Sequence, residues 1–327
     1  MILVLGGAGY IGSHMLQLLR EEGEAHLVFD NLEQGHRAAV VDSPLFIGDL
    51  RSADDLRRVF SENPEIDTVM HFAAYISVGE SVTDPAKYFQ NNTTAVIGLL
   101  DMMREFGIKR FVFSSTAAIF GNPQYVPIDE NHPKAPESPY GESKLMVERV
   151  LEAYDRAYGI KSVCLRYFNA SGGDPEARIG EDHRPETHLV PLAIWAAMGR
   201  GKGLKLFGTD YDTIDGTCVR DYVHVCDLAS AHHLAVQHLR NDGDSRRYNL
   251  GNGECFIVRQ VIETVEKVGG KPVPFEEGPR REGDPATLIA SSAAIRADWG
   301  WKPKYPDLET IVGHAWKWYE SHPNGYV

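Results

Sequence analysis

A tyrosine and a lysine four residues apart, Tyr140 and Lys144, are the residues of this chain best suited to acid–base chemistry. Residues at positions i and i+4 share one face of a helix, so the ammonium group of Lys144 can lie beside the phenol of Tyr140. A neighbouring positive charge favours the phenolate, so we expect a lowered pKa and a phenol that accepts protons near neutral pH. Most such pairs are only an exposed aromatic ring and a solvated lysine, so this pair needs a cofactor nearby to give it a role.

A glycine-rich turn near the start of the chain supplies a place for that cofactor. Gly6, Gly9 and Gly12 lie three residues apart, between the apolar run 2–5 and a helical pattern. Glycines at this point let backbone amides approach a pyrophosphate at the N-terminus of a helix. A purely structural turn is the alternative, but Asp30 ends the next apolar run, where a carboxylate binds the ribose hydroxyls of NAD and repels the additional phosphate of NADP. A base beside a hydride acceptor predicts the oxidation of an alcohol.

Alternating strands and helices over the first 170 residues place these groups together. Strands joined in this way form a doubly wound parallel sheet, which binds its ligand at the carboxyl ends of the strands. The fifth strand leads into the hydroxyl-bearing run 114–116, and Pro139 then opens the helix that carries Tyr140 and Lys144. The expected strands are residues 2–5, 26–29, 45–47, 68–72, 111–113 and 162–167, and the long helix before the fifth strand spans about 85–106.

The second half of the chain is organised differently. Residues 171–188 are rich in glycine, proline and acidic residues and predict a long loop, and four helical patterns separated by loops follow it. The fold class is therefore α/β, a doubly wound parallel Rossmann sheet with a smaller α+β substrate-binding lobe. We expect residues 1–170 to form the NAD-binding Rossmann domain and residues 171–327 to form mainly the lobe, with about 218–240 returning to the Rossmann domain.

The composition excludes several classes of protein. The chain has 327 residues, 24% of them charged, and a net charge of −13, which argues against a nucleic-acid or anionic-membrane partner. No apolar run approaches the roughly 20 residues that a membrane span needs. The four cysteines are scattered and no His/Cys group has metal-site spacing, so we predict neither a disulfide framework nor a metal site. The chain opens directly in a strand, so we expect no signal peptide and a cytoplasmic protein.

Six short motifs follow one another along the chain: the glycine-rich run 6–14, Asp30-Asn31-Leu32, His71-Phe72-Ala73-Ala74, Ser114-Ser115-Thr116, the Tyr140/Lys144 pair and Arg166-Tyr167-Phe168-Asn169. In this order they resemble the motifs of the extended short-chain dehydrogenase/reductases. Two later runs, 215–225 and 280–284, resemble those of the UDP-glucose 4-epimerase family. The resemblance extends from Met1 to about Trp318. It implies an NAD-dependent isomerase that interconverts UDP-galactose and UDP-glucose.

The resemblance also implies a role for each matching position. Tyr140 is the expected base, Lys144 adjusts its pKa and binds the nicotinamide ribose, and Thr116 is the hydroxyl partner. The expected NAD-binding residues are Gly6, Gly9, Tyr10, Ile11, Gly12, Asp30, Asn31, Asp49, Leu50, Phe72, Ala73, Ala74, Asn91, Tyr140, Lys144 and Phe168. The expected UDP-sugar-binding residues are Thr116, Tyr140, Asn169, His188, Leu189, Phe207, Arg220, Arg281, Asp284 and Leu288.

Departures from the family pattern leave the identity of the substrate's sugar undecided. His188 replaces an asparagine that part of the family has near the uridine, and Leu288 stands where some members have a bulky tyrosine. A smaller residue at 288 could admit an N-acetyl group, so a UDP-N-acetylhexosamine, a UDP-uronate or a UDP-pentose remains an alternative substrate. The family resemblance further implies a homodimer, with the helix at about 85–106 and the helix after Pro139 as the interface.

Two other functions are less consistent with the residues. A nucleotide-sugar 4,6-dehydratase on the same scaffold needs an acid/base pair just after the hydroxyl run, but Thr116 is followed by Ala117 and Ala118. A non-catalytic dinucleotide sensor could dispense with Tyr140 and Lys144, and both are present.

Overall fold

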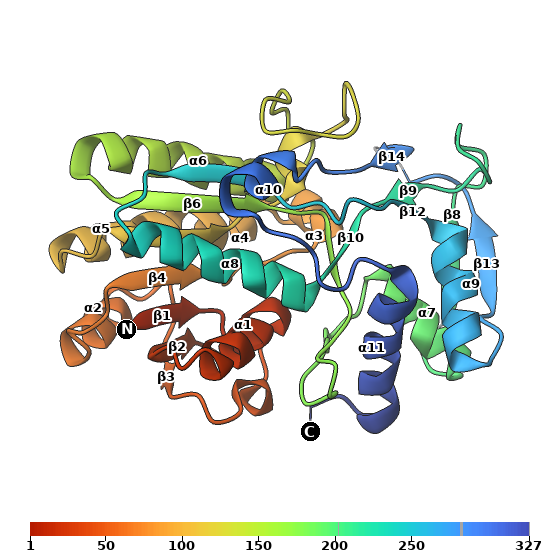
Figure 1. Cartoon of the computed structure of the whole chain (residues 1–327), viewed down its shortest axis with the longest axis horizontal. Helices are drawn as coiled ribbons and strands as arrows, with labels where there is room; N and C mark the ends of the chain where they lie inside the picture. The colour runs from red at the N-terminus through yellow and green to blue at the C-terminus, as the bar shows by residue number, and fades with distance from the viewer. Residues whose placement is uncertain (202, 282–283, 327) are drawn as a thin grey trace. The chain divides into compact units, whose positions relative to one another are not determined.

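The computed structural model describes residues 1–201, 203–281 and 284–326, and these form two compact units (Figure 1). The first unit contains residues 1–121, 133–166 and 229–248, and the second contains 122–132, 167–228 and the described part of 249–327. Of the run 280–284, residues 282 and 283 lie outside the described residues. The functional assignment of the two parts of the chain stays a prediction.

A seven-stranded sheet forms the centre of the first unit, and the predicted α/β class with its parallel sheet is confirmed. The strand order is β11-β6-β5-β4-β1-β2-β3, and β1 to β6 pair in parallel. The chain order reverses between β1 and β4, which creates a crevice at the carboxyl ends of these two strands. The strands are β1 (Ile2–Leu5), β2 (His26–Asp30), β3 (Leu45–Ile47), β4 (Thr68–His71), β5 (Arg110–Ser114), β6 (Lys161–Arg166) and β11 (Arg246–Asn249).

Helices cover both faces of this sheet (Figure 1). Local sequence explains several of their ends: Ser52 caps α2, Ser138 caps α6 with Pro139 at its first position, and Gly159 ends α6 in the left-handed conformation. Leucine, valine and phenylalanine side chains of α2, α5 and α6 pack against the strands. The helices are α1 (Tyr10–Glu21), α2 (Ala53–Glu62), α3 (Val78–Thr83), α4 (Pro85–Phe89), α5 (Ala95–Glu105), α6 (Pro139–Tyr158) and most of α8 (Val225–Arg240), with the 3₁₀ turns η1 (Arg37–Val40) and η3 (Ala117–Phe120).

The helix predicted at about 85–106 is interrupted. A π-helical turn, η2 (Gln90–Thr94), separates α4 from α5. Asn92 in this turn is buried; its side chain accepts the backbone N–H of Tyr75 at 3.0 Å and donates to the Tyr75 carbonyl at 2.9 Å. Thr93 donates to the backbone carbonyl of Ser143 at 3.1 Å. The turn therefore connects the segment after β4 to helix α6. Single π-turns inside α-helices are frequently found at functional sites.

The second unit has its own apolar core, built by α7, α9 and α11 with short strands beside them. Its small sheets pair β7 with β10, β8 with β13, and β9 with both β12 and β14. The helices are α7 (Leu189–Ala197), α9 (Val258–Gly269), α10 (Ala293–Trp299) and α11 (Leu308–Ser321). The strands are β7 (Asn169–Ser171), β8 (Leu204–Phe207), β9 (Val219–Arg220), β10 (Tyr222–His224), β12 (Phe256–Ile257), β13 (Phe275–Gly278) and β14 (Thr287–Leu288).

A buried ion pair fixes the end of β6 against α6 in the first unit. Arg166 donates from Nε and Nη2 to the two carboxylate oxygens of Glu148, at 2.9 and 2.6 Å, and both side chains are almost completely buried. Ser115 donates to the same carboxylate at 2.7 Å. Burial alone would raise the pKa of Glu148, but the hydrogen bonds and charge of Arg166 hold it below the ordinary value. The pair thus anchors the residue that precedes Thr116.

We predict that Glu148→Ala destabilises the protein by about 3–5 kcal/mol, because it leaves the guanidinium of Arg166 buried without its carboxylate. Urea unfolding followed by circular dichroism measures the loss. The matched control is Glu152→Ala, one helical turn away and half exposed beside Arg247, which we expect to cost less than about 1 kcal/mol. Equal losses in the two variants would contradict the role given to the buried pair.

Candidate functional site

The glycine-rich turn between β1 and α1 requires glycine at particular positions. Gly6 has φ of +77°, and a Cβ there would fall 2.5 Å from the backbone nitrogen of Ala73. A Cβ at Gly12 would fall 2.2 Å from the carbonyl oxygen of Gly6. Helix α1 begins at Tyr10, with Gly9 as its N-cap and no acidic residue in its first turn. The backbone is therefore free to approach an anionic group at the positive end of a 12-residue helix.

Asp30 ends β2 and joins this turn to the next loop. Its Oδ2 accepts the backbone N–H of Ala8 at 2.9 Å, and its Oδ1 accepts that of Leu32 at 2.8 Å. Burial raises the pKa of Asp30 above the ordinary value, and these two hydrogen bonds oppose the rise. The carboxylate is thus held at the carboxyl edge of the sheet beside the glycine turn.

One pocket of the first unit brings most of the predicted cofactor residues together. It lies along the carboxyl ends of β1, β2, β3 and β4. Ten predicted residues line it: Gly6, Gly9, Asp30, Asn31, Asp49, Leu50, Phe72, Ala73, Ala74 and Asn91. Tyr10, Ile11 and Gly12 form the first turn of α1 behind it. Phe168 follows β6 by two residues and belongs to the second unit.

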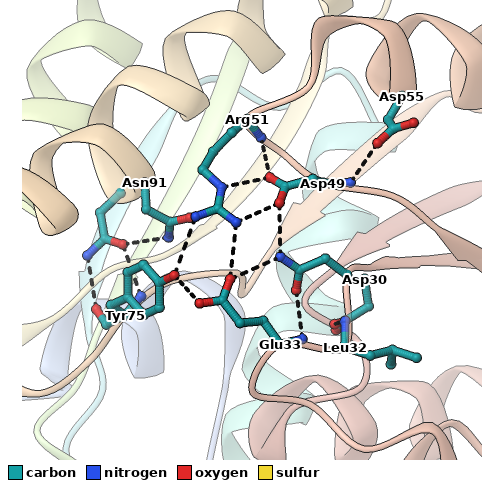
Figure 2. Close-up of polar contacts among 10 residues, drawn as sticks. Asp30, Leu32, Glu33, Asp49, Arg51, Asp55, Tyr75 and Asn91 are labelled. Atoms are coloured by element: carbon teal, nitrogen blue, oxygen red, sulfur yellow. Dashed lines mark hydrogen bonds and ion pairs between the residues drawn. The ribbon is translucent and has the colours of Figure 1, made fainter.

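Sequence reasoning missed several residues of this pocket, among them Glu33 and Tyr75. Figure 2 shows that they belong to a polar network around Arg51. Arg51 donates to Asp49 at 2.6 Å and to Glu33 at 3.1 Å, Tyr75 donates to Glu33, and Asn31 donates to Asp49 at 3.2 Å. The available signal for Glu33 was its place in the loop directly after Asp30, and for Tyr75 its place directly after Ala74, because both segments follow the carboxyl ends of strands.

The network gives this end of the pocket an acidic character. Hydrogen bonds from Arg51 lower the pKa of Asp49 to about 2, and burial, followed by Glu33, raises the pKa of Tyr75 to about 12. At neutral pH Asp49 is therefore ionised and Tyr75 is protonated. Arg51 forms ion pairs with Glu33 and Asp49, and these two carboxylates neutralise its positive charge. The pocket therefore offers little attraction to the additional phosphate that NADP carries, and the carboxyl group of Asp30 lies beside it.

The three predicted catalytic residues come together in the first unit. Thr116 follows β5, caps η3 through a 3.1 Å bond from the N–H of Ala118, and hydrogen-bonds with the side chain of Tyr140. Tyr140 lies in the first turn of α6, and its ring packs edge-on against that of Tyr88 with the ring centroids 6.5 Å apart. Lys144, one turn further, is buried and donates from Nζ to the carbonyl of Ser114 at 2.9 Å. The phenol, the hydroxyl and the ammonium group thus meet at the end of β5.

The pKa values in this cluster differ from the sequence expectation. Burial raises the pKa of Tyr140, and the hydrogen bond with Thr116 offsets part of the rise. Burial also lowers the pKa of Lys144 to about 7. The predicted lowering of the Tyr140 pKa is therefore not produced by the protein's own groups, because apolar surroundings disfavour phenolate and ammonium alike. Burial, followed by the charge of Lys144, lowers the pKa of His71 to about 3, so this imidazole is neutral.

The predicted substrate residues of the second unit form two groups. Arg220 on β9 makes an ion pair with Asp284, and Leu288 on β14 pairs with Arg220 in the β9–β14 ladder. The guanidinium of Arg281 lies 4.0 Å from the ring centroid of Phe207 at the end of β8. These five residues come from neighbouring short strands and the loop after β13, and they combine two cations with one aromatic face.

The other predicted substrate residues lie at the two ends of the loop 172–188. Asn169 on β7 donates to the carbonyl of Asp221 at 2.9 Å. His188 is the N-cap of α7, and Leu189 is its first residue. The imidazole of His188 faces Glu181 and Glu186, at 2.7 and 3.2 Å. Its Nδ1 is therefore directed at carboxylates of its own loop.

A glycine cradle, an acidic pocket at the carboxyl edge of a parallel sheet and a buried tyrosine–lysine–threonine cluster define a dinucleotide-dependent enzyme of the short-chain dehydrogenase type. The chain belongs to the NAD dependent epimerase/dehydratase family, whose model matches residues 2–251. This finding confirms the resemblance inferred from the motifs.

Within this family, the chain is similar over almost its whole length to several UDP-glucose 4-epimerases. The chain is 52% identical over 325 residues to a UDP-glucose 4-epimerase of Halalkalibacterium halodurans, covering 99% of this chain and 97% of the relative. It superposes on a crystal structure of a UDP-glucose 4-epimerase with a TM-score of 0.97 at 46% identity, covering 100% of this chain and 99% of the other. A UDP-glucose 4-epimerase of Brucella ovis, crystallised in complex with NAD, gives a TM-score of 0.94 at 44% identity, with 97% of each chain covered.

None of the helices in the described part of the chain has the length and apolar character needed to cross a bilayer.

Proposed function

We propose that this protein is an NAD-dependent 4-epimerase that interconverts UDP-galactose and UDP-glucose. The single observation that carries the proposal is the cluster of Thr116, Tyr140 and Lys144 in the same unit as a pocket that fits a dinucleotide. The fit rests on the positions where a Cβ would collide with backbone, Gly6 and Gly12, and on the Asp30 carboxylate beside them. The relatives described above have the same activity, and the one from Brucella ovis binds NAD.

In the proposed reaction Tyr140 takes the proton of the sugar 4-hydroxyl and later returns it to the same oxygen. NAD held in the pocket beside Gly6, Gly12 and Asp30 would supply reversible hydride transfer at C4. Thr116 orients the hydroxyl of Tyr140, and Lys144 provides the positive charge that favours its phenolate. Atoms and electrons balance within one turnover, because C4 is first oxidised to the ketone and then reduced on its opposite face.

The second unit would hold the UDP group while the sugar turns over. Arg220 and Arg281 are suited to a diphosphate, because guanidinium groups give charge-assisted hydrogen bonds to phosphate oxygens. Phe207 offers a ring for the uracil, and Asn169, His188, Leu189 and Asp284 complete the proposed set. Binding energy at this remote group keeps the 4-keto sugar from leaving before it is reduced.

The test is to incubate the purified protein with UDP-galactose, without added NAD, and to separate the products by chromatography. We expect UDP-glucose, formed by cofactor retained through purification. Failure with added NAD as well would refute this substrate pair. A parallel incubation with UDP-N-acetylgalactosamine then tests the second candidate, which the half-buried Leu288 favours because it leaves more space than a tyrosine.

Asp30→Ala is predicted to weaken NAD binding by about 10- to 100-fold, since a hydrogen bond to a charged group contributes roughly 1.5–3 kcal/mol. Calorimetric titration of NAD into cofactor-depleted protein measures the change. The control, Asp54→Ala in the exposed first turn of α2, should leave the dissociation constant unchanged. An unchanged dissociation constant in Asp30→Ala would show that Asp30 does not bind the ribose of NAD.

We further propose that the protein is a cytoplasmic homodimer. The helices expected at the interface carry apolar side chains that are exposed in the single chain, namely Phe106 after α5 and Met146 and Tyr158 on α6. Light scattering coupled to gel filtration distinguishes a dimer from a monomer.

A further inference from the structure

A cluster of two histidines and two glutamates lies in the loop before α7, and of its four members only His188 belongs to the proposed UDP-sugar-binding set. Glu181, His183, Glu186 and His188 each offer one ligand atom, and these atoms all lie within 4.8 Å of one another. The residues form the repeated pattern Glu-x-His, at 181–183 and 186–188. The sequence predicts no metal site, since this spacing matches no common zinc motif.

The four distances between histidine and glutamate atoms in the cluster are close to those around a small cation. Nδ1 of His188 lies 2.7 Å from Glu181 and 3.2 Å from Glu186, and Nδ1 of His183 lies 3.1 and 3.7 Å from the same two carboxylates. Four ligands at about 2.0–2.1 Å around tetrahedral zinc are separated by about 3.3 Å. The observed separations fall on both sides of that value.

Two atoms of the cluster are buried without a hydrogen-bond partner. Nδ1 of His188 is one, because its close approach to the carboxylates lacks hydrogen-bond geometry. Oε2 of Glu186 is the other: Oε1 already accepts the N–H groups of Thr187 and His188, and the side chain is completely buried. Both atoms are directed into the cluster: Nδ1 of His188 faces Glu181 at 2.7 Å, and Oε2 of Glu186 faces Nδ1 of His183 at 3.7 Å.

The rest of the loop holds the four ligands in place. Trp318 of α11 donates to the carbonyl of Glu181 at 3.2 Å, and Tyr326 donates its backbone N–H to Asp182 at 3.0 Å. Arg184 donates to Asp182 and to the carbonyl of Asn324. Asp182 and Arg184 therefore bind the C-terminal segment, while Glu181 and His183, which alternate with them along the chain, point into the cluster. All of these residues belong to the second unit.

We propose that Glu181, His183, Glu186 and His188 bind one zinc ion as a structural site. Two imidazoles and two carboxylates are ligands that suit zinc, whereas calcium and magnesium prefer all-oxygen sites. Two carboxylates neutralise the divalent charge within a largely buried site. With four protein ligands the zinc ion has no open coordination position, so its role is to fix the loop 172–188 at the start of α7, beside Leu189.

The experiment uses tag-free, NAD-containing protein that has been treated with a chelator and transferred to metal-free buffer. Titration with zinc, followed by elemental analysis of the dialysed protein, is expected to give one zinc ion per chain and a rise in Tm. Cobalt in place of zinc is expected to give the strong visible absorption of a four-coordinate site. Failure of the wild-type protein to retain zinc would overturn the proposal and leave the cluster as an ion-paired group.

Variants separate this site from adventitious binding. His183→Gln and Glu186→Gln each remove one ligand, and we expect at least on the order of a 100-fold loss of zinc affinity, no Tm response and no cobalt signal. Glu186→Gln keeps the acceptor for Thr187 and His188, so it decides the question if His183→Gln does not fold. The control, Glu176→Gln, changes an exposed residue of the same loop and should bind zinc as the wild type does. Equal zinc binding in all variants would overturn the assignment.

Discussion

Replacing Tyr140 by phenylalanine is expected to lower the turnover of UDP-galactose by on the order of 10³-fold while NAD stays bound. The change removes only the hydroxyl that hydrogen-bonds with Thr116 and keeps the ring that meets Tyr88 edge-on. Without that hydroxyl the cluster loses the group that we assign as the base, and His71 is a poor replacement because its pKa is about 3.

The measurement is kcat with UDP-galactose, together with the NAD content of the purified variant. Tyr88→Phe is the matched control, since it removes a hydroxyl of the neighbouring ring that donates to Glu80 at 2.8 Å. We expect Tyr88→Phe to keep kcat within a few-fold of the wild type. A Tyr140→Phe variant with more than a tenth of wild-type turnover would show that another group is the base. A variant that loses NAD as well would show that the hydroxyl acts mainly in binding.

Short-range sequence signals were sufficient to predict which residues line the pocket of the first unit. The glycine spacing, the position of Asp30 and the alternation of strands and helices are local patterns that together favour a parallel sheet with a crevice at the carboxyl ends of its strands. The parallel sheet then brings residues as distant as Gly6 and Asn91 to one edge, which explains why ten predicted residues line one pocket. The π-turn at 90–94 was not predictable in this way, because the buried bonds of Asn92 to Tyr75 create it and no local propensity signals it.

Features that depend on burial were also beyond the sequence. The i, i+4 spacing of Tyr140 and Lys144 predicts that they are neighbours, but the sign of the pKa shift depends on how much water remains around them. The zinc ligands show the same limit. Glu181 and His188, seven residues apart on a loop, lie 2.7 Å from each other, and Trp318 of α11 donates to the backbone carbonyl of Glu181. A motif search finds ligands by spacing on a helix or hairpin and does not find them on an irregular loop.

The pH dependence of Lys144→Met is the prediction that tests the catalytic pair as a unit. In the wild type the pKa of Lys144 is about 7 and that of Tyr140 is raised, so the pair gives up its first proton near pH 7. The one-proton form includes phenolate with ammonium, which is the form able to accept the proton of the sugar. Activity should therefore rise as the pH increases through about 7 and then reach a plateau.

In Lys144→Met the only proton to lose is that of Tyr140, whose pKa burial has raised. We expect the acidic limb of the kcat profile to move to higher pH by at least about 2 units, with a loss on the order of 10²-fold at pH 7 that lessens as the pH rises. Lys161→Met, an exposed lysine at the start of β6 paired with Asp155 and Asp244, is the control and should keep the wild-type profile. An unshifted limb in Lys144→Met would mean that the ammonium group positions the cofactor without setting the proton affinity of Tyr140. A shifted limb would mean that Tyr140 and Lys144 titrate as a coupled pair. The hydrogen bond of Lys144 to the Ser114 carbonyl holds the ammonium group at the end of β5, where such coupling is possible.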